Sequence, residues 1–307
     1  MTDRIDIAVA WDWQFDRDFI SLLEAQCRAR GLRMCAPGAE DAANVAAALN
    51  AGTLLVGTFL DRAAPDEEPF AGLALAMRAS GARCLNPPEA VRRAADKATM
   101  HLEFLSRGIA VPYTIIISPY NRERQVELTL EQLARLGRPF IIKPANTTGG
   151  GTGVITGAET LRDVIDSRKH HRDDKYLLQE KVVPALCGGR RAWFRVFYVC
   201  GGIFPCWWDD LTHVYAEVAP EGAEGWCEGV SLSPLVSMTR EISGVCGLDF
   251  FSTEIAMTAG GAFVAVDYVN EICDMRFQSR HPDGVPDALA LAIGGILADQ
   301  ACPRSGS

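Results

Sequence analysis

A lysine followed by a glycine-rich loop is the feature of this 307-residue chain that most directly suggests chemistry. Residues 140–154, FIIKPANTTGGGTGV, are predicted to form an apolar strand ending at Lys143, followed by a loop that holds Gly149, Gly150, Gly151 and Gly153. Glycines let backbone N–H groups approach phosphate oxygens, and the lysine adds a compact positive charge. The lysine precedes the glycines, which distinguishes the stretch from a P-loop. The pattern predicts a triphosphate site; its alternative is a flexible hairpin tip with a chance lysine.

Two acids further along the chain are predicted to form a metal site. Glu254 and Asp267 fall on the two strands of a hairpin, STEIAMTAGGAFVAVD, whose turn is Gly260-Gly261. Cross-strand acids on one face repel each other unless a cation lies between them. Mg²⁺ prefers few carboxylates together with phosphate oxygens and water, which fits this pair. Neutralising one acid is therefore expected to relieve repulsion and stabilise the metal-free protein.

Arginines alternate with aromatic residues on another predicted strand. Arg191, Trp193, Arg195 and Phe197 follow a period of two and therefore share one face. An arginine among aromatic residues is costly to bury without an anion partner. The strand therefore predicts either an anion contact or a structural ion pair, with Arg195 the stronger candidate for the anion contact.

Three units are predicted along the chain. Residues 1–88 alternate strands and helices in a βαβ manner, which predicts a small parallel sheet covered by helices and ends at the punctuation Asn86-Pro87-Pro88. Residues 89–184 read as a compact α+β unit that contains the glycine loop, and residues 185–307 begin with strands and end with a helix. Two lobes that flank a glycine loop leave a cleft, where ligands usually bind.

Composition limits the classes of partner. The formal net charge of −9, with acids and bases mixed, disfavours nucleic acids and anionic membranes, and the apolar runs are too short to span a bilayer. The N-terminus carries acids too early for a signal peptide, and the ten cysteines show no metal-binding spacing. We expect a cytoplasmic protein with reduced thiols.

Taken together, these pieces resemble the ATP-grasp superfamily. Six segments occur in one order over roughly residues 86–280: Asp96-Lys97, GIAVPYT, FIIKP with its glycine loop, YLLQEKVV, STEIAM and AFVAVDYVNE. The resemblance implies an ATP-grasp fold of the α/β and α+β classes, with residues 1–88 as the pre-grasp domain, 89–184 as the central domain with the small lobe, and 185–307 as the C-terminal lobe with the metal site. It implies ATP and Mg²⁺ (or Mn²⁺) as cofactors.

The activity most often implied is that of a carboxylate–amine ligase working through an acyl phosphate and releasing ADP and phosphate. Similar members include D-alanine–D-alanine ligase, glutathione synthetase and ribosomal-protein glutamate ligase. Two alternatives are a small-molecule kinase and a nucleotide-binding protein without turnover. A kinase for a polyphosphorylated substrate would need a basic pocket, and the chain has few clustered Lys and Arg residues.

The resemblance also implies roles for individual residues. Lys97 and Lys143 match the two phosphate-contacting lysines, and Arg195 matches an arginine at the transferred phosphate. The adenine-reading hinge falls on Gln179, Glu180, Lys181 and Val182. Besides Glu254 and Asp267, the family uses an asparagine as third metal ligand, for which Asn270 is the candidate. Asn270 lies three residues after Asp267, so it shares that face only if the strand bulges or ends between them; Glu271 is its rival.

Two departures from the family leave the substrate open. Cys187-Gly188-Gly189 stands where an acid often contacts the ribose, and EICDMRFQS replaces the usual Ser-Pro-Gly after the asparagine. Within that segment Arg276 is predicted to orient an amino-acid-like carboxylate, unless it pairs with Asp274 or Asp283. Possible holders of an ammonium group in the first unit are Asp12, Asp16 and Asp61. The expected partner is a small molecule or a peptide, and the sequence leaves homodimer formation open.

Overall fold

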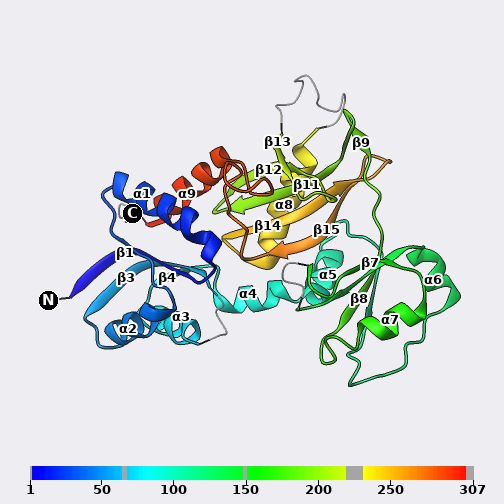
Figure 1. Ribbon diagram of the computed structural model, residues 1–307, viewed down its shortest axis with the longest axis horizontal. Helices are drawn as coiled ribbons and strands as arrows, with labels where there is room; N and C mark the ends of the chain where they lie inside the picture. Colours follow the sequence, from blue (N-terminus) through cyan, green and yellow to red (C-terminus); the bar gives the residue numbers. More distant parts are fainter. Residues whose placement is uncertain (1, 64–67, 148–150, 219–230, 302–307) are drawn as a thin grey trace.

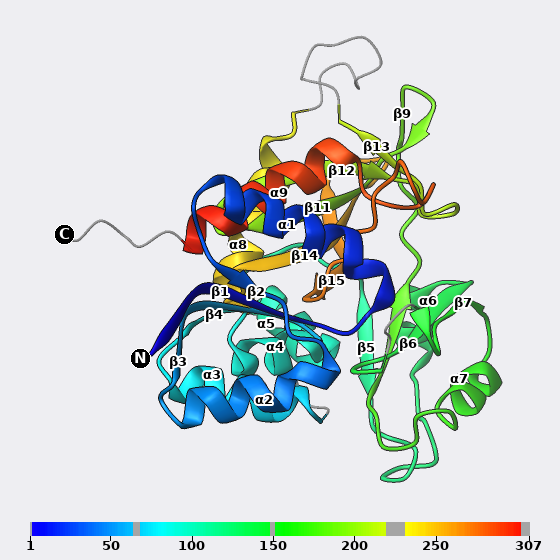
Figure 2. The ribbon, with the colours of Figure 1, turned by 60° about the vertical axis from the view of Figure 1, so that its left-hand side comes forward.

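The computed structural model describes residues 2–63, 68–147, 151–218 and 231–301, which form three lobes (Figures 1 and 2). Gly149 and Gly150 of the predicted phosphate loop lie outside these residues. None of the helices in the described ranges is long and apolar enough to cross a membrane. Seven of the described cysteines are outside any disulfide, as expected, whereas Cys187 is disulfide-bonded, contrary to the expectation of reduced thiols throughout.

The first lobe is the βαβ unit predicted from the sequence. Its parallel sheet has the order β2-β1-β3-β4, and helices α2 and α3 cover one face. The bounds of the elements are β1 Asp3–Trp11, η1 Gln14–Asp16, α1 Arg17–Ala29, β2 Met34–Cys35, α2 Ala39–Asn50, β3 Leu54–Arg62, α3 Phe70–Ala79 and β4 Arg83–Leu85. The alternation of apolar strand and amphipathic helix explains the layers, because each helix buries its apolar face on the sheet.

The second lobe is small and antiparallel, with the strand order β5-β8-β6-β7. Helices α4 and α5 lead into it from the first lobe (Figure 1). The bounds are α4 Pro88–Ala95, α5 Lys97–Ser106, β5 Thr114–Ile117, α6 Leu130–Leu136, β6 Phe140–Pro144, β7 Ile155–Ala158, α7 Leu161–Ser167 and β8 Tyr176–Glu180. Helices α6 and α7 each begin with a capping box, at Thr129 and Thr160.

The third lobe is built on an antiparallel sheet of order β13-β12-β11-β14-β15. Helix α8 packs on one face of this sheet. The bounds are β9 Leu186–Cys187, β10 Arg190–Arg191, β11 Trp193–Val199, β12 Gly202–Trp208, β13 Tyr215–Glu217, α8 Ser233–Cys246, β14 Phe250–Met257, β15 Phe263–Asn270 and α9 Asp287–Ala301. Strand β14 is buried along its whole length, as expected of a central strand.

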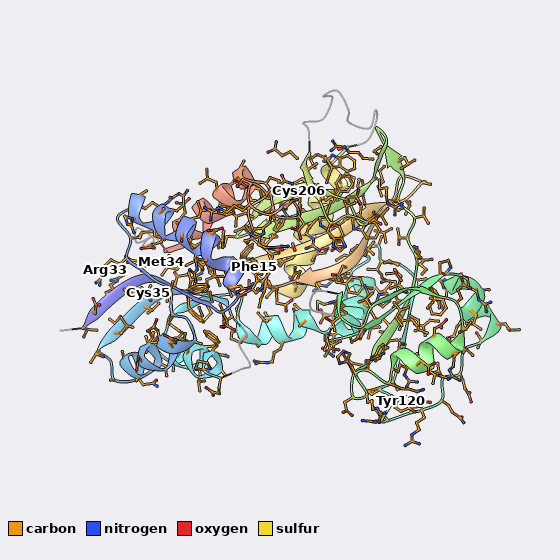
Figure 3. The ribbon with its side chains drawn as sticks, in the orientation of Figure 1. Phe15, Arg33, Met34, Cys35, Tyr120 and Cys206 are labelled. Carbon is orange, nitrogen blue, oxygen red and sulfur yellow. The ribbon has the colours of Figure 1, made fainter. Side chains whose placement is uncertain are left out.

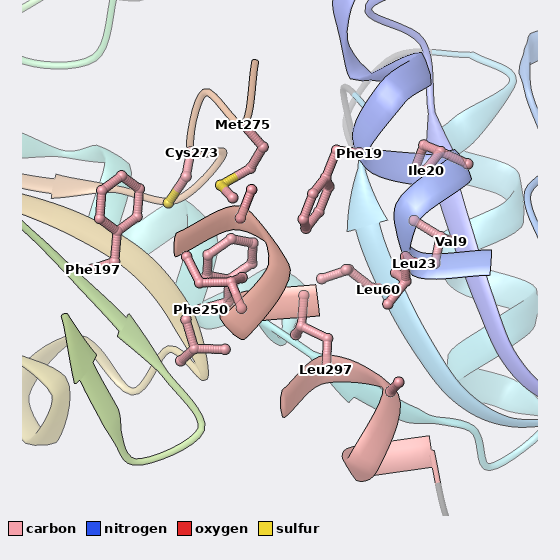
Figure 4. Close-up of a cluster of buried hydrophobic side chains, with 14 of the residues drawn as sticks. Val9, Phe19, Ile20, Leu23, Leu60, Phe197, Phe250, Cys273, Met275 and Leu297 are labelled. Carbon is pink, nitrogen blue, oxygen red and sulfur yellow. The ribbon is translucent and has the colours of Figure 1, made fainter. Parts of the chain in front are cut away.

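One hydrophobic cluster joins the first and third lobes. Phe19 and Leu60 of the first lobe pack with Phe197 and Phe250 of the large sheet, and α9 packs beside α1 (Figure 4). Figure 3 labels Phe15 where these two lobes meet. The C-terminal helix thus returns to the N-terminal sheet, and the small lobe is the part that stands apart.

Candidate nucleotide and metal site

The two predicted phosphate lysines are brought together by the start of α5 and the end of β6. Asp96 caps α5 by accepting from the backbone N–H groups of Ala98 (2.9 Å) and Thr99 (3.1 Å), which makes Lys97 the first helical residue. The backbone N–H of Lys97 also donates to the carbonyl of Ala145 at 3.0 Å, two residues after Lys143. The helix start and the strand end are therefore joined by a hydrogen bond.

Both lysines point to the same carboxylate. The Nζ atoms of Lys97 and Lys143 lie 3.9 and 3.6 Å from Oδ1 of Asp267, and Lys143 also donates to the Val266 carbonyl at 3.1 Å. Burial acts to raise the pKa of Asp267, but nearby cations outweigh it and hold that pKa below its ordinary value. These cations are Lys97, Lys143 and Arg195. Burial lowers the pKa of the Lys143 amine, while Asp267 opposes that shift.

Arg195, Glu254 and Asp267 form a row across three neighbouring strands. Arg195 of β11 lies opposite Glu254 of β14, which lies opposite Asp267 of β15. Arg195 forms a close ion pair with Glu254, and Trp193 donates from its indole nitrogen to the same carboxylate at 3.2 Å. The Arg195 guanidinium also stacks 4.5 Å from the Trp208 ring. Burial would lower the pKa of Arg195, but Glu254 outweighs it and raises that pKa.

Strand β15 has the bulge that Asn270 needs. Glu254 pairs with Asp267 and Ser252 pairs with Asn270, so two steps along β14 match three along β15. The exposure of β15 follows this shift, because Asp267 and Asn270 are both partly exposed while the two residues between them are buried. The irregularity brings Asn270 to the side of Asp267, as its assignment requires. Its role as a metal ligand stays a prediction.

Glu271 follows the bulge and lies close to the same cluster. Burial raises the pKa of its carboxyl. The charge of Asp267 adds to that rise, whereas the charge of Lys97 opposes it. Its side chain also lines a small hollow between the first and third lobes, together with Asp61, Asn86 and Val91. The structure therefore places both candidates for the third ligand beside Asp267.

Hinge residues lie on β8 and on the segment after it. Glu180 Oε1 accepts from the backbone N–H of Tyr113 at 2.7 Å, so its carboxylate is engaged within the small lobe. Gln179 is fully buried and donates to Thr114 (3.3 Å) and to the hydroxyl of Tyr268 (3.2 Å). Within the described part of the chain its Oε1 atom has no hydrogen-bond partner, so this amide has a free acceptor beside the hinge.

The other two hinge residues differ in burial. Lys181 is exposed, whereas Val182 packs against a small apolar cluster of Trp193, Ala256 and Val266. That cluster lies on the sheet that carries Arg195 and Glu254, so an apolar surface borders the charged row.

The described end of the glycine loop adopts conformations that favour glycine. Gly151 and Gly153 have φ angles of +78° and +76°. A Cβ on Gly153 would also lie 3.1 Å from the Pro144 ring, so the chain returns close to the end of β6 here.

Arg276 lies in an ion-paired cluster. Its guanidinium donates to Asp274 (2.6 Å) and Asp283 (2.8 Å) and lies over the rings of Trp13 and Phe15. Arg276 therefore pairs with both Asp274 and Asp283, the two alternatives to a substrate carboxylate. Its role toward such a carboxylate stays a prediction.

Asp16 cannot hold a substrate ammonium group, contrary to the expectation from the sequence. It is fully buried and forms a bidentate pair with Arg62 at 2.6 and 3.0 Å. Arg191 likewise forms a bidentate pair, with Asp210. This pairing fits the expectation that Arg195 is the stronger candidate for the anion contact.

Sequence reasoning missed a buried polar network beneath the lysines. Tyr268 receives contacts at its hydroxyl from His101 Nδ1 (2.6 Å) and from Gln179, and its ring lies 5.4 Å from Lys143 Nζ. Burial and the charge of Lys143 lower the pKa of His101 to about 4, so its imidazole is neutral near pH 7. A signal was present, because His101 lies four residues after Lys97 and hence on the same helix face.

The charged cluster has the chemistry of a site for a metal-bound polyphosphate. Three cations, Lys97, Lys143 and Arg195, surround the carboxylates of Glu254 and Asp267. Among the described residues no group of three or more His, Cys, Asp or Glu side chains is arranged to hold a metal. Two carboxylates and an amide nevertheless fit Mg²⁺, which takes its remaining ligands from phosphate and water.

Comparison with known proteins finds similarity at the level of structure. Neither a scan against family models nor a search of curated proteins by sequence gives a match. A RimK domain ATP-grasp protein from Sphaerobacter thermophilus matches with a TM-score of 0.66 at 20% identity, covering 97% of this chain and 99% of that one. The ATP-grasp ligase PsnB, in complex with a minimal precursor, Mg and ADP, matches with a TM-score of 0.63 at 15% identity, covering 96% and 97%.

Two further neighbours span the chain equally well. The macrocyclase MdnC from Microcystis aeruginosa, bound to its precursor peptide MdnA, has a TM-score of 0.64 at 13% identity, covering 96% and 99% of the two chains. The D-cycloserine synthetase DcsG has a TM-score of 0.61 at 15% identity, with the same coverage. The predicted fold is thereby confirmed: the chain has the ATP-grasp fold over almost its whole length.

Proposed function

We propose that this protein is an ATP- and Mg²⁺-dependent ligase that joins a carboxylate to an amine through an acyl phosphate. The observation that carries the proposal is the row Arg195–Glu254–Asp267 with Lys97 and Lys143 directed at its end. Two structural neighbours, the ATP-grasp ligase PsnB and the D-cycloserine synthetase DcsG, support the same class of activity.

In this proposal the nucleotide lies between the small and the large sheet. Lys97 and Lys143 exchange part of their contact with Asp267 for the phosphates, and Glu254, Asp267 and Asn270 hold Mg²⁺. Bound there, Mg²⁺ would supply charge neutralisation for the phosphates. Arg195 is held in place by Trp208 and Glu254 and stabilises charge on the transferred phosphoryl group. Adenine occupies the hinge, where the backbone of Lys181 and Val182 can read its edge.

The bonds change in two steps. A carboxylate oxygen of the acid attacks the γ-phosphorus of ATP, which forms the acyl phosphate and releases ADP. The amine then attacks the acyl carbon, the C–O bond to phosphate breaks, phosphate leaves, and the amine loses a proton. Neither step needs a side-chain nucleophile.

The proposed acid is amino-acid-like, either free or within a peptide. Structures of PsnB and MdnC contain precursor peptides, which supports testing peptide carboxylates beside free amino acids. The deciding experiment measures ADP and phosphate release with pairs of acids and amines, including dipeptides and acidic peptides. Release that requires both an acid and an amine supports a ligase. Release of ADP but not of phosphate, in the presence of a hydroxyl acceptor, would indicate a kinase. Binding of ATP without release of ADP would indicate a nucleotide-binding protein without turnover.

A further inference from the structure

Two buried side chains of the first lobe hold the turn that follows the metal strand. This turn, residues 270–273, carries both candidates for the third metal ligand. Arg62, the last residue of β3, donates from an Nη atom to the Cys273 carbonyl at 2.8 Å. Asn86, which follows β4, donates from its amide to the Glu271 carbonyl at 3.3 Å. Both contacts cross from the first lobe to the third.

The guanidinium of Arg62 is fixed on all sides. Its other contacts are the bidentate pair with Asp16, and the rings of Phe19 and Phe250 at 5.1 and 5.9 Å. Phe19, Phe250 and Cys273 belong to the cluster that joins the two lobes (Figure 4). Arg62 is only 3% exposed, so its position over the Cys273 carbonyl is set by packing as well as by charge.

Asn86 connects the same turn to the start of β14. Its side-chain oxygen accepts from the backbone N–H groups of Asp249 (3.0 Å) and Phe250 (2.8 Å), and its amide also donates to the Phe250 carbonyl. Asn86 has a φ angle of +63°, a conformation that asparagine tolerates better than most residues. Since β14 carries Glu254, one side chain fixes the start of one metal strand and the turn after the other.

From this geometry we infer that Arg62 and Asn86 are positioning residues for the metal site. The inference rests on the proposed function, because it concerns the Mg²⁺ that the ligase would use. Mg²⁺ demands near-ideal geometry at about 2.0–2.1 Å, so a small movement of the turn weakens the site. The first lobe thus contributes to metal binding without supplying a ligand.

The test compares Arg62→Lys with Arg168→Lys. Lysine at position 62 keeps a positive charge beside Asp16 but cannot form the fork and reach the Cys273 carbonyl together. Arg168 is a matched control, because it is also a fully buried arginine that donates to backbone carbonyls, those of Ser118 and Glu123 in the small lobe.

Calorimetry measures binding of the non-hydrolysable analogue AMPPNP with Mg²⁺ and with EDTA. We expect Arg62→Lys to weaken the Mg²⁺-dependent part of the affinity about fivefold or more and to leave binding in EDTA unchanged. Arg168→Lys should leave both unchanged even where it lowers the melting temperature. If Arg62 only stabilised the fold, both variants would have a lower melting temperature, and Arg62→Lys would show no selective loss of Mg²⁺-dependent affinity.

Asn86→Gly is a second variant, which keeps the backbone conformation and removes the amide contacts. If Arg62→Lys fails to fold, the Mg²⁺-dependent affinity of Asn86→Gly tests the inference. Unchanged Mg²⁺-dependent affinity in the folded variants, or equal losses in Arg168→Lys, would overturn the inference while the parent still binds Mg²⁺·AMPPNP. If the parent itself does not bind Mg²⁺·AMPPNP, the proposed function is overturned and the inference with it.

Discussion

Glu254 and Asp267 lie directly opposite each other on neighbouring strands, yet their carboxylates engage different cations. Glu254 pairs with Arg195, while Asp267 lies within 4 Å of the amines of Lys97 and Lys143. Each acid is therefore balanced without a metal, and the expectation that neutralising one would relieve repulsion is not supported. Removing either acid instead leaves a largely buried cation without its partner.

The metal acids are expected to matter for turnover and also for stability. Glu254→Gln should abolish most ligase activity and lower the free energy of unfolding by about 3 kcal/mol, because Arg195 loses its buried partner. Asp267→Asn should affect turnover as strongly, but stability less, since its carboxylate is partly exposed.

Steady-state assays across a Mg²⁺ titration, with urea unfolding, measure both effects. Asp210→Asn is the matched control, since it breaks another arginine–aspartate pair of the same lobe, with Arg191, and Asp210 is not a candidate metal ligand. Normal turnover of both metal-acid variants at saturating Mg²⁺ would show that these acids do not bind the metal.

Lys143→Ala is expected to lose ATP binding while the protein remains folded. Charge-assisted contacts to phosphate contribute about 1.5–3 kcal/mol, which corresponds to roughly ten- to a hundredfold in affinity. Asp267 keeps Lys97 as a partner, so the fold survives. Thermal shift with Mg²⁺ and ATP measures the loss, and Lys169→Ala, an exposed lysine paired with Asp166, serves as the control. An equal ligand-induced shift in both variants would remove Lys143 from the site.

His101 is expected to make stability depend on pH in the acidic range. Its folded-state pKa is about 4, whereas its ordinary value is 6.5, so the unfolded chain binds a proton first. The stabilisation is present above pH 6.5 and is lost as the pH falls toward 4, at about 1.4 kcal/mol per unit and up to about 3 kcal/mol in total.

The measurement is urea unfolding from pH 7.5 to 4.5 for the parent and for His101→Asn. Asparagine can keep a hydrogen bond to Tyr268 but does not titrate. The difference between the two curves should shrink as the pH falls. Parallel curves would mean that His101 does not remain neutral in the folded protein.

Arg276 is expected to orient the acceptor carboxylate, directly or through its loop. Arg276→Lys should raise KM or lower kcat by roughly tenfold or more, because lysine cannot form the fork that now holds Asp274 and Asp283. The assay uses whichever acid supports ADP release. A lower melting temperature with unchanged kinetics would make Arg276 a structural ion pair and leave the acceptor site open.

The sequence by itself determined the fold and the identity of the charged residues. The βαβ alternation of residues 1–88, the strand before the glycine loop and the hairpin with Glu254 and Asp267 are all present, because they depend on local periodicity and turn chemistry. The position of Lys97 was accessible only through the family resemblance, since a lysine at a helix start has no signal of its own.

Only the tertiary structure decided which charges meet. The bulge that brings Asn270 beside Asp267 depends on pairing with β14, and the burial of Asp16 depends on Arg62, 46 residues away along the chain. The contact of Arg62 with the Cys273 carbonyl spans 211 residues. Such contacts follow from how distant segments of the chain pack, within a lobe or between lobes. Neither periodicity nor spacing records them, because both describe only neighbours along the chain.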